Sequence, residues 1–362
     1  MNSPKLLFVF GTRPECIKLA PLIVEAKKRL LQIETCFTGQ HLEMAQPILD
    51  YFKIIPDYSL NIMKKDQTLN DISKALYEKL QPILLNSQPD YVLVQGDTTT
   101  AATAATIAFN EKIKVAHIEA GLRTHNLHSP WPEEFNRRVI ALAADLHFTP
   151  TEKATLQLTK EGIPTDKIHT VGNTGIDALR LVNEKSVSIS KTHDKFKILV
   201  TLHRRENFGN EMISLMQGLK VLCEQNPKIE ITWPLHQNPN VRKSFDHVFT
   251  QRLVNLKIIE PLNYFDFIQA MKQTDLIVTD SGGIQEEAPF LGKPVLVCRK
   301  DTERTESVDC GSARMIGTDA AELIRTVQEL SLKNSVYEKM AQKRTPYGDG
   351  YSAKKIIDIF CK

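Results

Sequence analysis

Short apolar segments alternate with helix-length amphipathic segments along nearly the whole chain. The apolar segments are rich in Val, Ile, Leu and Phe, and each ends at a polar or glycine-containing turn. One series lies at residues 6–10, 33–38, 91–94, 115–118 and 146–149, and a second lies at 197–201, 229–233, 256–259, 276–278 and 294–298. Near-continuous apolar strands that alternate with helices are typical of parallel sheets covered on both faces. The pattern therefore predicts an α/β protein with one doubly wound domain in each half and a cleft between the halves.

The stretch with the least apolar character lies between the two series. Residues 183–195 (NEKSVSISKTHDK) are polar and rich in serine, which is typical of a segment near an interdomain connection. The last segment, residues 351–362, carries four large apolar residues near its end, and we expect it to form a closing helix.

Composition supports two globular domains and excludes several classes of protein. The chain has 362 residues, 42% hydrophobic and 25% charged, which suffices for a substantial core in each domain. Its formal charge of +3 is spread without the basic runs that bind a nucleic-acid backbone. The six cysteines lack CxxC spacing, so we expect reduced thiols and no metal site. With no signal-like or membrane-spanning apolar run, we expect a cytoplasmic protein that binds neither nucleic acid nor membrane.

Polar residues follow several predicted strands, at the edge where ligands bind in open α/β sheets. The first strand is followed by Gly11-Thr12-Arg13-Pro14-Glu15, with Lys18 one helical turn further on. A glycine turn that opens a helix binds anions through its N–H groups and the helix dipole, and Arg13 and Lys18 would add positive charge. The turn matches neither GxGxxG nor a P-loop. A purely structural turn with a surface arginine is the alternative.

Carboxylates follow two adjacent predicted strands. Asp97 in QGDTTT and Glu119 in HIEAGLR are expected to face one crevice. The alternative for Asp97 is a helix N-cap. His117 could help to position Glu119, although a core histidine is the more common role. Glu133 begins a helix after a Pro-Trp-Pro turn, where the helix dipole also favours an acidic residue for structural reasons alone.

The second half offers a histidine and a glycine turn at strand ends. His203 is followed by two arginines, which should depress its basicity and suit it to acid/base work or phosphate contact. A surface basic turn is the alternative. Residues 281–283, Ser-Gly-Gly, offer backbone donors for a diphosphate at a helix N-terminus. Glu287 is spaced to accept hydrogen bonds from a ribose, and Arg304 would add a cation to the same rim. These residues point to a nucleotide-linked, sugar-bearing anion.

Ten motifs, in order over nearly the whole chain, resemble those of one known family. They are GTRPE, QGDTTT, HIEAGLRT, SPWPEEFNRR, FTPTE, VGNTGIDAL, HRREN, PLHQNPNV, DSGGIQEEAP and YGDG. The set resembles the non-hydrolysing UDP-N-acetylglucosamine 2-epimerases. The resemblance implies two Rossmann-like domains of the glycosyltransferase type B fold, a homodimer, a UDP-sugar substrate, no cofactor and a role in cell-envelope polysaccharide synthesis. It implies an N-terminal domain at 1–175 with most acid/base residues, a UDP-binding domain at 176–345, and a C-terminal helix at 346–362 that packs back on the first domain.

Matched residue by residue, the resemblance implies three sets of site residues. The acid/base positions fall on Asp97, Glu119, Glu133 and His203. The UDP-contacting positions fall on Arg13, Lys18, Phe267, Ser281, Gly282, Gly283, Glu287 and Arg304. In some bacterial members a second UDP-N-acetylglucosamine is an allosteric activator, and its contacts match Gln40, His41, Arg204 and His236. The chain departs from the family at Leu202, where Gly often stands, at Thr305, where Pro usually stands, and at residues 65–67, where some members are basic.

The implied reaction interconverts UDP-N-acetylglucosamine and UDP-N-acetylmannosamine. The hydrogen on C2 of the sugar is not next to a carbonyl, so its removal needs the departure of UDP, which leaves 2-acetamidoglucal. Re-addition then requires acid/base groups on both faces of the sugar, and the sequence does not assign a residue to either face. A modified substrate such as a 2,3-diacetamido sugar is one alternative, because Leu202 and Thr305 are expected to border the pocket. A non-catalytic UDP-sugar sensor is another.

Overall fold

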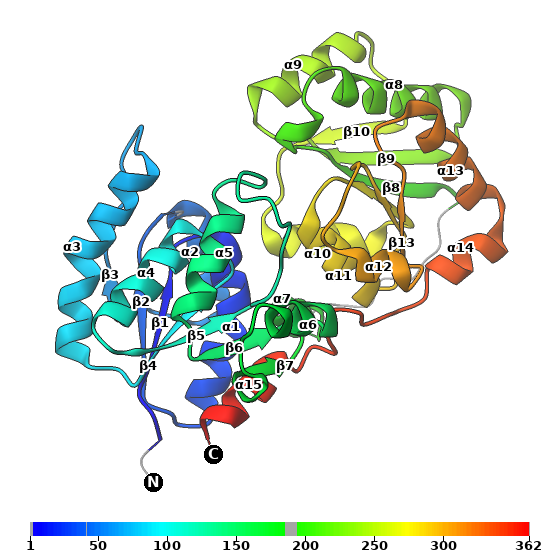
Figure 1. Cartoon of the computed structure of the whole chain (residues 1–362). Coiled ribbons are helices and arrows are strands. Elements are labelled where there is room, and N and C mark those ends of the chain that lie inside the picture. The colour runs from blue at the N-terminus through cyan, green and yellow to red at the C-terminus, as the bar shows by residue number, and fades with distance from the viewer. Residues whose placement is uncertain (1–2, 41, 185–193, 362) are drawn as a thin grey trace. The chain divides into compact units, whose positions relative to one another are not determined.

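The structure is a computed structural model that describes residues 3–40, 42–184 and 194–361. The chain divides into two compact units, Met1–Leu181 with Tyr347–Lys362, and Val182–Pro346. Each unit is built around its own parallel sheet (Figure 1). Most of the interdomain connection predicted at 183–195 lies outside the described residues.

The first unit contains a parallel sheet of seven strands. They are β1 (Leu6–Phe10), β2 (Ile33–Phe37), β3 (Tyr58–Ser59), β4 (Tyr91–Gln95), β5 (Lys114–Ile118), β6 (Leu146–Thr149) and β7 (Ile168–Thr170). The helices are α1 (Arg13–Lys28), α2 (Leu42–Phe52), α3 (Leu69–Ser87), α4 (Thr99–Asn110), α5 (Glu133–Ala143), α6 (Glu152–Lys160), α7 (Thr174–Glu184) and α15 (Ser352–Phe360), with the 3₁₀ turn η1 (Thr165–Lys167). The strand order is β3-β2-β1-β4-β5-β6-β7, and all five side chains of β1 are buried.

The second unit contains a parallel sheet of six strands. They are β8 (Phe196–Thr201), β9 (Ile229–Pro234), β10 (Leu256–Ile259), β11 (Leu276–Thr279), β12 (Val295–Val297) and β13 (Ala313–Met315). The helices are α8 (Asn210–Gln225), α9 (Pro239–Val248), α10 (Tyr264–Gln273), α11 (Gly282–Phe290), α12 (Thr305–Asp309), α13 (Ala320–Leu332) and α14 (Asn334–Met340), with the 3₁₀ turn η2 (Arg205–Asn207). The strand order is β10-β9-β8-β11-β12-β13. Trp233 is fully buried in its core, edge-on to Phe245 and Phe249.

The predicted α/β class and the ten predicted strands are confirmed, each bound within one residue of the prediction. The pattern did not predict β3, β7 and β13, because two or three residues are too few to show a periodicity. Both sheets are doubly wound, with the strand order of a Rossmann fold. The topological switch point, where the strand order changes direction, lies between β1 and β4 in one sheet and between β8 and β11 in the other. A ligand site is expected beyond the carboxyl ends of these strands.

The C-terminal segment packs on the first unit, where α15 lies against α1 (Figure 1). The Phe360 ring lies 5.2 Å from that of Tyr91. Asp177 on α7 accepts hydrogen bonds from the N–H groups of Ser352 (3.1 Å) and Ala353 (2.8 Å), which begin α15. Over the three described ranges, no helix has the length and apolar character needed to cross a membrane.

Candidate active site

A carboxylate of the chain itself closes the N-terminus of α1. Glu15 is fully buried, and its Oε2 accepts hydrogen bonds from the N–H groups of Gly11 (3.0 Å) and Thr12 (2.7 Å). Burial raises the pKa of Glu15, although these bonds and one from the Thr98 hydroxyl oppose the shift. Gly11 has no room for a side chain, because a Cβ there would lie 2.0 Å from Thr38 Oγ1. The turn was predicted to bind an anion through free N–H groups, and those of Gly11 and Thr12 are not free.

Glu119 follows β5 in a backbone conformation with φ of 67°, which non-glycine residues adopt rarely. Its Oε2 accepts a hydrogen bond from Gln95 Nε2 (2.8 Å) and forms an ion pair with Lys18 of α1. His117 is buried, with Nε2 2.7 Å from the Gly96 carbonyl, and burial lowers its pKa to about 3. His117 is thus a core histidine, and Glu119 is held by Lys18 and Gln95.

Asp97 follows β4 and is held by α5. Arg137 Nε and Nη2 lie 2.8 and 2.7 Å from Asp97 Oδ2, and Asn136 Nδ2 donates to the Asp97 carbonyl (2.8 Å). The N-cap of α4 is Thr98, whose hydroxyl accepts a hydrogen bond from the Ala101 N–H (3.0 Å). The N-cap alternative for Asp97 is therefore wrong. Its carboxylate forms an ion pair with the buried Arg137 instead.

Glu133 is the first residue of α5 and differs from its neighbour Glu134. Glu134 is fully buried and accepts hydrogen bonds from the Thr124 N–H (2.9 Å) and Arg138 Nε (3.3 Å), so it holds the preceding loop in place. The Oε2 atom of Glu133 is also buried, but it has no hydrogen-bond partner within the described ranges. Because buried polar atoms are nearly always paired in folded proteins, an unpaired carboxylate oxygen points to a ligand.

In the second unit, the turn after β8 is built around Asp280. This fully buried carboxylate accepts hydrogen bonds from the N–H groups of His203 (3.0 Å) and Arg204 (2.9 Å) and from Asn207 Nδ2 (3.2 Å). The His203 ring stacks on that of His236, 5.4 Å between centroids. Burial lowers the pKa of His203; Asp280 opposes this shift, and His236 and Arg204 add to it. The predicted depressed basicity is confirmed, with burial as its first cause.

The N-terminus of α11 is open, in contrast to that of α1. The Ser281 N–H donates to Thr279 Oγ1 (2.9 Å), whereas the amides of Gly282 and Gly283 have no acceptor in the part of the chain described. A Cβ on Gly282 would lie 2.7 Å from Arg304 Cζ, while one on Gly283 would meet nothing within 4 Å. Two N–H groups at the positive end of the helix therefore remain for an anion.

Arg304 lies next to Gly282 of this turn, and its guanidinium is already paired with carboxylates. Its Nε lies 2.8 Å from Glu286 Oε1, and it forms a second ion pair with Glu303. Arg304 thus lies at the predicted rim, and its charge is offset by two carboxylates. Glu287 is half-buried, with Oε1 3.4 Å from Tyr264 Oη.

Other predicted site residues lie on both units. Arg13 begins α1 and Phe267 lies on α10, both half-buried. Gln40 Oε1 accepts a hydrogen bond from the Thr100 hydroxyl (3.0 Å) in the first unit, whereas Arg204 and His236 belong to the second. His41 lies outside the described residues.

The two departures near the predicted pocket differ. Leu202 is 1% exposed and belongs to the hydrophobic core of the second unit, so the prediction that it borders the pocket is wrong. Thr305, half-buried, begins α12 directly after Arg304.

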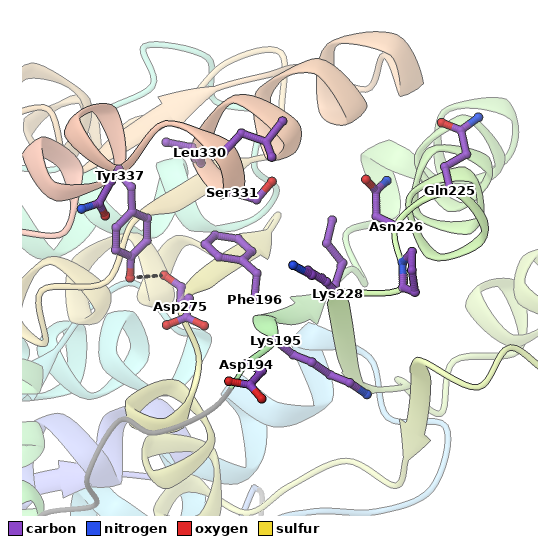
Figure 2. Close-up of a pocket in the computed structure, with 14 residues that line it drawn as sticks. Asp194, Lys195, Phe196, Gln225, Asn226, Lys228, Asp275, Leu330, Ser331 and Tyr337 are labelled. Carbon is purple, nitrogen blue, oxygen red and sulfur yellow. Dashed lines mark hydrogen bonds between the residues drawn. The ribbon is translucent and has the colours of Figure 1, made fainter.

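A pocket of about 700 Å³ opens at the other end of the second sheet (Figure 2). Its lining includes Phe196, Lys228 and Asp275, which lie at or just before the starts of β8, β9 and β11. Tyr337 Oη donates a hydrogen bond to the Asp275 carbonyl (3.2 Å) on one side of this pocket. It is therefore separate from the carboxyl-end turns that carry His203 and Asp280. Within the described ranges, no group of three His, Cys, Asp or Glu side chains is arranged to hold a metal ion.

Comparison with known proteins supplies the family. The family model described as UDP-N-acetylglucosamine 2-epimerase matches residues 24–361. A UDP-N-acetylglucosamine 2-epimerase of Campylobacter jejuni is 46% identical over 374 residues, which cover 99% of this chain and 97% of that protein. The chain belongs to the UDP-N-acetylglucosamine 2-epimerase family.

Solved structures agree with this assignment. The crystal structure of UDP-GlcNAc 2-epimerase from Neisseria meningitidis bound to UDP-GlcNAc has a TM-score of 0.92 at 43% identity, covering 99% of each chain. The glycotransferase of kitacinnamycin, at 15% identity and a TM-score of 0.65 over 99% of this chain and all of that one, shares the fold alone. The predicted family, its epimerase class and the glycosyltransferase type B fold are confirmed.

Sequence reasoning gave no role to four residues that organise the site in this UDP-N-acetylglucosamine 2-epimerase family member. They are Glu15, Asn136, Arg137 and Asp280. For Glu15 a signal was present, because Thr12 and Glu15 have the spacing of a capping box. The other three are recognisable only from their long-range contacts, 39 to 77 residues away along the chain.

Proposed function

We propose that this member of the family interconverts UDP-N-acetylglucosamine and UDP-N-acetylmannosamine without hydrolysis. The observation that carries the proposal is the set of three carboxylates on the first unit in three different settings. Asp97 is paired with Arg137, Glu119 is paired with Lys18, and Glu133 has a buried oxygen without a partner among the residues that the structure describes. Such a set can supply proton transfer to a bound sugar at more than one position.

The chemistry has two balanced steps. In the first, the C1–O bond of the sugar breaks, UDP leaves with the electron pair, and a base takes the C2 proton, so that a C1=C2 double bond forms in 2-acetamidoglucal. In the second, an acid delivers a proton to the opposite face of C2, and an oxygen of UDP bonds to C1. We assign the proton transfers to Asp97, Glu119, Glu133 and His203.

We assign the diphosphate to the open N-terminus of α11. The Gly282 and Gly283 amides and the helix dipole would stabilise the negative charge that develops as UDP leaves. The charge of Arg304 is already paired with Glu286 and Glu303. Arg304 would therefore stabilise this turn by packing against Gly282. The remaining UDP contacts in the proposal are Arg13, Lys18, Phe267, Ser281 and Glu287.

Deuterium exchange tests the proposal directly. The purified protein is incubated with UDP-N-acetylglucosamine in D₂O without added NAD or metal, and C2 of the sugar is followed by NMR. We expect deuterium at C2 and a growing signal of UDP-N-acetylmannosamine. A folded protein that binds UDP and leaves C2 unexchanged in a panel of UDP-sugars would be a sensor, and the proposal would be wrong.

The same panel addresses the substrate. Leu202 gives no reason to expect a decorated sugar, because it lies in the core. We therefore expect turnover of UDP-N-acetylglucosamine to exceed that of its 2,3-diacetamido analogue.

We also propose that the chain works as a cytoplasmic homodimer. Helices α3, α4 and α5 pack side by side in the first unit (Figure 1). Each exposes large apolar side chains, namely Tyr77, Leu85, Phe109, Phe135 and Leu142. Exposed apolar side chains on adjoining helices favour association with a second copy. Free thiols at all six cysteines suit a reducing compartment.

A further inference from the structure

Asp280 forms hydrogen bonds with three residues of the turn that carries His203. Its carboxylate accepts the backbone N–H groups of His203 and Arg204 and the side-chain amide of Asn207, and it is 0% exposed. His203 Nδ1 lies 3.4 Å from Asp280 Oδ1, whereas the His203 side chain as a whole keeps 36% of its surface exposed. The carboxylate therefore faces one nitrogen of the ring.

We propose that Asp280 is a positioning residue that holds the proton of neutral His203 on Nδ1 and leaves Nε2 as the nitrogen that exchanges protons with substrate. This inference rests on the proposed function for the role of Nε2, but the position of the proton does not depend on turnover. A carboxylate that faces one imidazole nitrogen favours the tautomer with the proton on that nitrogen.

The other groups around the ring do not compete for the Nδ1 proton. Arg204 offers only donors, and the Nδ1 of the stacked His236 already accepts a hydrogen bond from the Asn238 N–H (3.1 Å). Asp280 is thus the one acceptor found facing Nδ1 in the described part of the chain. A 3.4 Å separation is longer than a good hydrogen bond, and such contacts often shorten when substrate binds.

Asp280 also links the two chemical parts of the second unit. Asp280 directly follows β11, and the next residues, 281–283, form the turn that begins α11. The side chain of Asp280 holds the turn after β8, and its hydrogen bonds go to His203, Arg204 and Asn207 of that turn.

The test reads the ring nitrogens of His203 in the full-length protein. With ¹⁵N-labelled histidine, long-range ¹H–¹⁵N NMR distinguishes the two tautomers, and His203→Gln assigns the signal. In the wild type we expect the proton on Nδ1. In Asp280→Asn we expect a shift toward the Nε2–H tautomer, because the carboxylate is lost. A wild-type ring with its proton on Nε2 would overturn the proposal, even if no variant folds.

Kinetics give an independent readout. We expect kcat of Asp280→Asn to fall by about 100-fold, the lower end of what a positioned acid/base group contributes. The pH–rate limb of His203 should move to lower pH, because Asp280 raises the pKa of His203 against the effects of burial, His236 and Arg204. UDP affinity, measured by calorimetry, should stay within about threefold, since Asp280 does not touch the ligand in this proposal.

Two further variants separate positioning from a general structural role. The double variant Asp280→Asn/His203→Gln should be no slower than His203→Gln, because Asp280 acts only through His203. Asp275→Asn removes a carboxylate that accepts the Lys197 N–H (2.9 Å) at the other end of β11, and it should leave kcat and the tautomer unchanged. Additive losses, or an equal loss in Asp275→Asn, would contradict the proposal. If the wild type shows no turnover, the proposed function fails while the NMR result still decides this one.

Discussion

At the scale of single residues, neighbours decide what each carboxylate can do. Glu15 and Glu133 are both acidic residues at the start of a helix, yet Glu15 closes its own helix, whereas one oxygen of Glu133 has no partner in the described part of the chain. The helix dipole favours an acidic residue at the start of either helix, so this local rule does not distinguish the two. The capping-box spacing indicates locally that Glu15 closes its own helix, and Thr98 adds a long-range hydrogen bond. The setting of Glu133 depends on the fold around α5, which the sequence does not show.

Asp97→Asn should slow epimerisation by a factor of about 10² to 10⁴, the range expected when a general acid/base is lost. The amide cannot take a proton from C2, yet it can still accept one hydrogen bond from Arg137, so the turn should persist. Turnover by NMR and UDP affinity by calorimetry separate the two effects, and UDP affinity should change little.

A matched control for this variant is Asp145→Asn. Asp145 accepts the Val115 N–H (3.0 Å) at the amino end of the first sheet, away from Asp97. Its replacement should leave turnover unchanged. An unchanged rate in Asp97→Asn would remove Asp97 from the acid/base set.

At the scale of elements, the two glycine turns that look alike in sequence differ in structure. Both follow a central strand and open a helix. A Cβ on Gly11 would collide with Thr38 Oγ1, and one on Gly282 would displace the paired guanidinium of Arg304. The α1 turn is filled by Glu15 and the α11 turn is open. The strand-turn-helix pattern could be predicted from local periodicity, and the capping-box spacing of Thr12 and Glu15 indicates locally that the α1 turn is filled.

Gly282→Ala should destabilise the second unit and weaken UDP binding. The new methyl group would lie 2.7 Å from Arg304 Cζ, and overpacking of this kind costs about 1 to 3 kcal/mol. Gly283→Ala is the matched control, because its Cβ would meet nothing within 4 Å and alanine favours the helix. Urea unfolding should show a lower stability for Gly282→Ala only; equal effects would contradict the steric argument.

Asp177 should make the attachment of α15 sensitive to pH. Burial raises the pKa of Asp177 to about 6, although the Ser352 and Ala353 N–H groups oppose the shift. As pH rises from about 4 to 6, the unfolded chain loses this proton before the folded chain does, so the free energy of unfolding falls. A shift of about two pKa units corresponds to about 3 kcal/mol.

Asp177→Asn should remove this part of the pH dependence, because asparagine does not ionise. Urea unfolding at pH 4 and pH 7 measures the difference, and the gap between the two stabilities should change by about 3 kcal/mol relative to wild type. Asp358→Asn, at a half-buried position of the same helix where the carboxylate pairs with Arg29, is the control. Identical pH profiles for wild type and Asp177→Asn would contradict the role of Asp177.

At the scale of the whole molecule, the fold depends on the helix faces that pack on the sheets. The proposed dimer depends on helix faces that stay exposed in the single chain. The alternation of apolar strands and amphipathic helices was sufficient to predict two doubly wound sheets, because strands buried on both faces are apolar throughout. The attachment of residues 347–362 to the first unit depends on contacts such as Phe360 with Tyr91, which are far apart in sequence.

Leu142→Glu should weaken the proposed dimer. Leu142 is 83% exposed on α5, and a charge in an apolar contact between copies would be desolvated at a high cost. Light scattering should show a wild-type mass near twice the 41.0 kDa of the chain and a lower mass for the variant. Leu332→Glu, equally exposed on α13, is the control and should leave the mass unchanged. A monomeric wild type would contradict the proposal.

The sequence by itself determined the class of fold, the strands and the family, because these follow from periodicity and from motifs that are local in the chain. It also predicted the turns that carry the proposed site residues, since parallel strands of a doubly wound sheet bring their carboxyl ends to one edge. Only the tertiary structure decided which charges are already paired. Lys18 meets Glu119, Arg304 meets Glu286, and Asp280 meets His203 across 77 residues. Such pairings depend on distances in space, and these are set by the packing of helices on the sheets.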